Sequence, residues 1–64
     1  MLEEAEIVGQ FRALLQLEQQ AEQVYAQMLA QVQDAKMRQQ IEQLHKDKLK
    51  HIRLTERLLE IVEG

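Results

Sequence analysis

Three ionisable side chains stand where this sequence otherwise places apolar residues. Apolar residues recur at intervals of three and four from residue 7 onward, as they do on one face of an amphipathic helix. In the first half, the heptad series 7, 14, 21, 28 is apolar throughout, and the series 11, 18, 25, 32 is apolar or aromatic except at Glu18. The series 41, 48, 55, 62 and 37, 44, 51, 58 are broken by Lys48 and His51. A carboxylate, an ammonium and an imidazole on core-facing stripes predict either an ion-paired polar layer or a metal site.

The elements that must position these groups are helices. The chain has no proline, only two glycines and no alternating strand pattern, so we predict an all-α protein. We expect a two-helix antiparallel hairpin in a single domain, with helices at about 4–32 and 36–62 and a turn at about 33–35. Asp34 is a suitable N-cap for the second helix. The alternative is an adaptor with one unbroken helix of about 60 residues in an extended coiled coil, which is rare among natural helices.

Charge supports the hairpin. Residues 1–33 carry five glutamates and one arginine, a net charge of −4, whereas residues 34–64 carry seven basic and six acidic side chains, a net charge of +1. Opposite charge bias favours packing of the two halves against each other. Because a helix rises 1.5 Å per residue, Glu18, Lys48 and His51 would lie about 24, 21 and 25 Å from a turn at Asp34. We therefore expect the three side chains to meet at one level.

The length of the chain predicts self-association. A single core of fewer than about 70–80 residues rarely supplies enough stability alone, and this chain of 64 residues has no cysteine for a disulfide or a thiolate metal site. A second copy would cover the two apolar stripes and give a homodimeric four-helix bundle. The net charge of −3 argues against nucleic acid as a partner. No apolar run suggests a membrane span, and we expect a cytoplasmic protein.

Two segments resemble the half-site of the ferritin-like superfamily, in particular the rubrerythrin group and the short encapsulated ferritins. The first is Glu18–Tyr25, with the sequence EQQAEQVY, and the second is Lys48–His51, with the sequence KLKH. In that family, a Glu in a Glu-x-x-Ala-x-x-x-Tyr setting on one helix joins a Glu-x-x-His motif on the next to bind iron. The resemblance implies a helical hairpin that dimerises into a bundle, with Glu18 and His51 as metal ligands.

One position departs from the family pattern and decides the function that we predict. Lys48 stands where the motif has Glu, and an ammonium group cannot coordinate iron. We therefore predict a non-catalytic structural or oligomerisation module in which a polar layer of Glu18, Lys48 and His51 replaces the di-iron site, with no cofactor. The alternative is an iron- or zinc-binding protein related to ferroxidases that uses Glu18 and His51. Glu22 and Asp47 are weaker candidate ligands near the rim of that site, and His45 is expected at the edge of the helix face.

Overall fold

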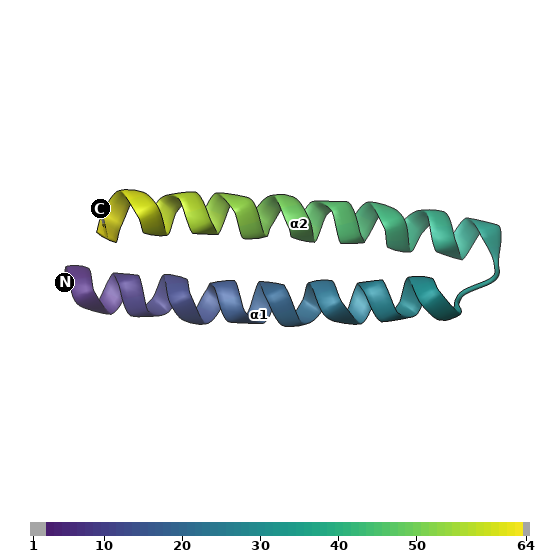
Figure 1. Cartoon of the computed structure of the whole chain (residues 1–64), viewed down its shortest axis with the longest axis horizontal. Helices are drawn as coiled ribbons and strands as arrows, with labels where there is room; N and C mark the ends of the chain where they lie inside the picture. The colour runs from purple at the N-terminus through teal and green to yellow at the C-terminus, as the bar shows by residue number, and fades with distance from the viewer. Residues whose placement is uncertain (1–2, 64) are drawn as a thin grey trace.

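Two helices of similar length lie side by side. The computed structural model describes residues 3–63, with α1 (Glu4–Gln31) and α2 (Ala35–Glu63) packed against each other. Figure 1 shows the connecting turn at one end of the pair, with the first residues of α1 and the last residues of α2 at the other end. The molecule is a rod measuring 47 × 18 × 15 Å. The predicted all-helical hairpin is confirmed, and a single unbroken helix is excluded.

Helix α1 is built from strong helix formers. Leu, Ala, Gln and Glu fill most of its positions, and Glu4 and Glu6 in its first turn complement the positive end of the helix dipole. The helix continues through Gly9 without interruption. It ends where Val32 becomes extended, and the Val32 N–H donates to the carbonyl of Met28 at 2.9 Å.

The turn is held by Asp34 and Arg38. The Met37 N–H donates to the Asp34 carboxylate at 2.9 Å, so Asp34 caps α2 as the sequence predicted. The Arg38 side chain donates to the carbonyl of Leu29 at 2.6 Å and so satisfies one of the free acceptors at the end of α1. None of residues 32–34 has a positive φ angle, which explains why this turn needs no glycine.

The residues that line the contact between the helices recur at alternating intervals of three and four. Together they form what we call the interhelical seam, a left-handed coiled-coil type of contact. Among residues 3–63 only Thr55 and Leu59 are buried, at 6% and 8% exposure, so the seam is thin. Its members on α1 are Val8, Phe11, Leu15, Glu18, Glu22, Tyr25 and Leu29, and on α2 they are Ile41, His45, Lys48, Ile52, Thr55, Leu59 and Val62.

A second apolar stripe on each helix lies outside the seam, and this corrects one expectation. The series 7, 14, 21, 28 and 37, 44, 51, 58 were predicted to face the core, but most of their members are exposed. Ten large apolar side chains in residues 3–63 are exposed. Each of them lies one residue before a position of the heptad series that forms the seam. We call this set the apolar face: Ile7, Leu14, Leu17, Val24, Met28, Met37, Leu44, Leu54, Leu58 and Ile61.

The apolar face occupies one side of the hairpin. Two antiparallel helices are related by an approximate two-fold axis perpendicular to the plane that contains them. Rotation about that axis does not exchange the two sides of the plane. Equivalent heptad positions of α1 and α2 therefore fall on the same side of the hairpin. Within residues 3–63, neither helix has a stretch that is long and apolar enough to span a membrane.

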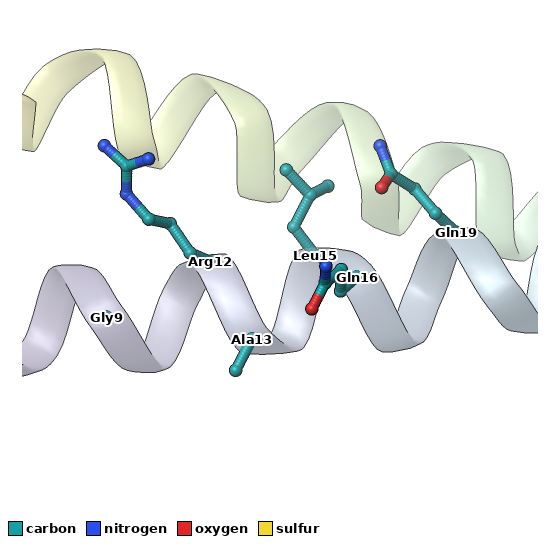
Figure 2. A pocket seen from close by; sticks show the side chains of 6 residues that line it. All are labelled: Gly9, Arg12, Ala13, Leu15, Gln16 and Gln19. Atoms are coloured by element: carbon teal, nitrogen blue, oxygen red, sulfur yellow. The ribbon is translucent and has the colours of Figure 1, made fainter.

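The opposite side of the hairpin is polar. Arg12 and Glu63 form an ion pair that joins α1 to α2 there. A groove on this side runs along α1, and Figure 2 shows Arg12, Leu15 and Gln19 reaching toward α2 while Ala13 points away from it. Among the six residues that line the groove, Arg12 is the only charged one, so the groove gathers no reactive set of side chains. These residues are Gly9, Arg12, Ala13, Leu15, Gln16 and Gln19.

Candidate functional site

The middle of the interhelical seam is polar on both helices. Glu18 and Glu22, one turn apart on α1, face His45 and Lys48, which are three residues apart on α2. Apolar seam residues lie on either side of this stretch, with Leu15 and Tyr25 flanking it on α1. The hairpin therefore holds two neighbouring polar layers, where the sequence predicted one.

Glu18 and Lys48 form the first layer. The Lys48 Nζ donates to Glu18 Oε1 at 3.4 Å and lies 3.2 Å from Glu18 Oε2. The Lys48 side chain is 27% exposed and the Glu18 side chain 15%, so the pair is largely shielded from water. The Oε2 atom is buried and has no hydrogen-bond partner of good geometry, which leaves charge attraction as its main compensation.

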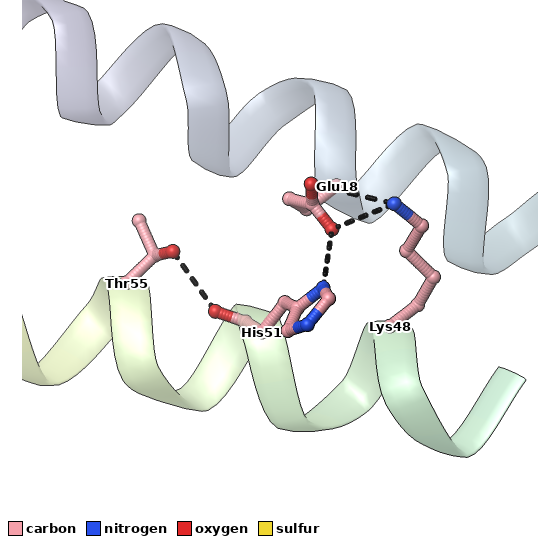
Figure 3. A network of polar contacts seen from close by, with 4 residues as sticks. All are labelled: Glu18, Lys48, His51 and Thr55. Carbon is pink, nitrogen blue, oxygen red and sulfur yellow. Dashed lines mark hydrogen bonds and ion pairs between the residues drawn. The ribbon is translucent and has the colours of Figure 1, made fainter. Parts of the chain in front are cut away.

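His51 approaches the same carboxylate from the side. Its Nδ1 lies 3.7 Å from Glu18 Oε2, and 57% of its side chain is exposed. Figure 3 marks this contact by a dashed line from the His51 ring to the Glu18 carboxylate. His51 was expected to face the core, but its position places it beside the apolar face, next to Leu44 and Leu58 in the heptad series. Thr55 lies in the seam one turn further along α2, and its hydroxyl donates to the His51 carbonyl at 2.9 Å. Glu18, Lys48 and His51 thus lie together, with His51 at the rim.

His45 and Glu22 form the second layer, which the heptad series did not predict. The His45 Nε2 lies 2.8 Å from Glu22 Oε1, and these side chains are 22% and 25% exposed. Their expected positions at an edge and a rim were wrong because the series 8, 15, 22, 29 lines the seam in place of 7, 14, 21, 28. The clue available in the sequence was the match between two polar residues, one on each half, at equal distance from the turn.

Asp47 does not join either layer. Its carboxylate accepts a hydrogen bond from Gln43 on the same helix at 3.3 Å. It directly precedes the seam residue Lys48 and so lies on the side of the helix that carries the apolar face. Asp47 is therefore placed next to the exposed apolar residues of α2 and not in the polar part of the seam.

Three of the four candidate metal ligands, Glu18, Glu22 and Asp47, contact side chains that are not metal ligands or lie outside the predicted site. The Lys48 ammonium lies against the Glu18 carboxylate and brings positive charge to the position that a cation would need. Glu22 is engaged with His45, and Asp47 with Gln43. In residues 3–63, no three His, Cys, Asp or Glu side chains converge as metal ligands would. The chemistry of these contacts is that of charge pairing and hydrogen bonding between helices.

Comparison with known proteins adds no relative. No family model, no curated protein and no solved structure matches this chain. The resemblance of Glu18–Tyr25 and Lys48–His51 to the ferritin-like half-site therefore stays a prediction from the residues themselves.

Proposed function

We propose that this chain is a non-catalytic oligomerisation module, a ferritin-like hairpin that pairs with a second copy to form a four-helix bundle. The observation that carries the proposal is the apolar face. Ten exposed large apolar side chains on one side of a 64-residue hairpin form a surface of the kind that monomeric proteins avoid. The seam alone buries only Thr55 and Leu59 within residues 3–63, which is too little for an independent domain.

The polar layers have a structural role in this proposal. Apolar seams tolerate sliding of one helix along the other, whereas charged groups in a seam need particular partners. A shift of α2 by one heptad would place Lys48 opposite apolar side chains and leave Glu18 unpaired. The pairs Glu18–Lys48 and Glu22–His45 thus favour one register of the hairpin, and that register sets the shape of the apolar face.

The proposal is tested by mass in solution. Light scattering after size exclusion should give about twice the chain mass of 7.6 kDa at micromolar concentration. Leu44→Lys places a charge on the apolar face and should weaken association at least about 100-fold. Gln39→Lys is the matched control, because it adds the same charge to an exposed position of α2 that lies outside the apolar face. A wild-type chain that is helical, cooperatively folded and monomeric would refute the proposal.

A further inference from the structure

The apolar-face residues of α2 belong to a stripe of eight positions whose spacing is symmetric about its centre. Its positions are 37, 40, 44, 47, 51, 54, 58 and 61, which lie two, five, nine and twelve residues on either side of Leu49. Position 47 is Asp and position 51 is His, so the two ionisable members of this stripe are the pair closest to its centre. The remaining positions hold apolar residues, except for Gln40.

We infer that two copies associate face to face with their turns at opposite ends, so that Asp47 of each copy pairs with His51 of the other. The inference rests on the proposed self-association and assigns its geometry. With a two-fold axis at the level of Leu49, α2 crosses α2 of the second copy in antiparallel orientation. Leu44 then meets Leu54, Met37 meets Ile61, and Asp47 meets His51, each reciprocally.

The stripe on α1 accommodates the same axis. Its positions 7, 10, 14, 17, 21, 24, 28 and 31 lie at the same offsets on either side of Gln19. Leu14 would then meet Val24, and Leu17 would meet Ala21. The contacts of Glu18 with Lys48 and of Glu22 with His45 put Gln19 and Leu49 within about 3 Å of each other along the rod. One two-fold axis therefore serves both helices.

Charge complementarity selects this arrangement over its alternatives. A shift by one heptad in either direction places Asp47 opposite Leu58 or Leu44 of the second copy. If the turns lay at the same end, α2 would face α1, and Asp47 and His51 would lie at the level of Ala21 and Leu17. Each alternative buries a carboxylate against apolar side chains, which is unfavourable without a partner.

The free atoms of the two side chains suit the pairing. The Asp47 Oδ1 accepts from Gln43, which leaves Oδ2 for another donor. The Nδ1 of His51 is directed at Glu18, and Figure 3 shows the second ring nitrogen pointing away from that carboxylate. The exposed part of the His51 ring is thus available to a group on a second molecule.

Cysteine cross-linking tests the geometry, since the chain has no cysteine of its own. The double variant Leu44→Cys/Leu54→Cys should form a disulfide-linked dimer under mild oxidation. Val24→Cys/Leu44→Cys would link two chains only if the turns lay at the same end, and should stay unlinked between chains. Gln43→Cys/Arg53→Cys on the outer surface is the control. Linking through Val24 and Leu44, or a dimer that neither pair links, would overturn the geometry and leave the self-association intact, whereas a monomeric wild type would refute both.

A charge exchange tests the pair itself. His51→Asp places like charges opposite each other and should weaken dimerisation about tenfold or more at neutral pH. The exchange Asp47→His/His51→Asp restores opposite partners and should recover most of that affinity. Both variants remove His51 from Glu18 in the same way. Positions 47 and 51 also lie one turn apart on the same helix, so the difference between the variants reports the contact between chains as far as it exceeds the roughly twofold effect of such an intrahelical pair. Equal affinities for the two variants would contradict the pairing.

Discussion

The Lys48 ammonium lies 3.2 Å from Oε2 of Glu18, across thirty residues of sequence and in the centre of the interhelical seam. The charge of the ammonium group thus compensates a carboxylate that is largely shielded from water. The contact explains how a seam of so few buried residues can include a buried carboxylate oxygen. It also makes the stability of the hairpin dependent on both partners.

Removal of one partner should cost more than removal of both. Lys48→Met leaves the Glu18 carboxylate shielded and unpaired, and should lower the free energy of unfolding by about 1–3 kcal/mol. The double variant Glu18→Leu/Lys48→Met replaces the pair by apolar contact and should be at least as stable as the wild type. Urea unfolding at one fixed chain concentration measures both. A double variant less stable than the wild type would show that the pair contributes net stability.

The pair of His45 and Glu22 should show measurable coupling. His45→Ala removes a 2.8 Å contact in the seam and should destabilise the fold by about 1–2 kcal/mol. A double-mutant cycle with Glu22→Ala should give a coupling energy of at least about 0.5 kcal/mol. Gln20→Ala, on the exposed surface of α1, is the control and should change stability by less than about 0.5 kcal/mol. Additive single effects would mean that the two side chains do not interact in solution.

Asp34 should be the residue of the turn most sensitive to substitution. Asp34→Ala removes the acceptor for the Met37 N–H and should cost about 1 kcal/mol of unfolding free energy. Asp34→Asn retains a capping oxygen and should lose much less. Thermal unfolding followed by circular dichroism distinguishes the two variants. Equal losses would indicate that charge at the end of the helix, and not the hydrogen bond, stabilises the turn.

Gly9 offers a substitution that should stabilise the protein. It lies inside α1, and a Cβ atom added to it would meet nothing within 4 Å. Gly9→Ala should therefore raise the free energy of unfolding by about 0.5–1 kcal/mol, because alanine loses less backbone entropy in a helix. The same unfolding measurement checks this expectation. A loss of stability would reveal a second molecule packed against this side of α1, which the proposed bundle leaves open.

Much of the fold was predictable from local features of the sequence. Strong helix formers, intervals of three and four between apolar residues, and Asp34 at a helix start together indicated a two-helix hairpin. The meeting of Glu18 with Lys48 followed from equal distances to the turn, because a helix rises by a constant amount per residue. The absence of Gly and Pro from the turn weakened its signal, and the structure supplies the reason, since residues 32–34 all keep negative φ angles.

Only the tertiary structure decided which apolar stripe faces the other helix. Each helix carries two such stripes, about one residue apart in heptad position. Periodicity alone does not tell which of the two contacts the other helix. Packing selected the stripe that contains Glu22 and His45, so these two form a partly buried contact while Ile7, Leu14 and their neighbours are left exposed. The physical reason is that the angle of a helix about its own axis is fixed by its partner and not by its own sequence period. Because of this angle, the residues expected to form one core are divided between the interhelical seam and the exposed apolar face.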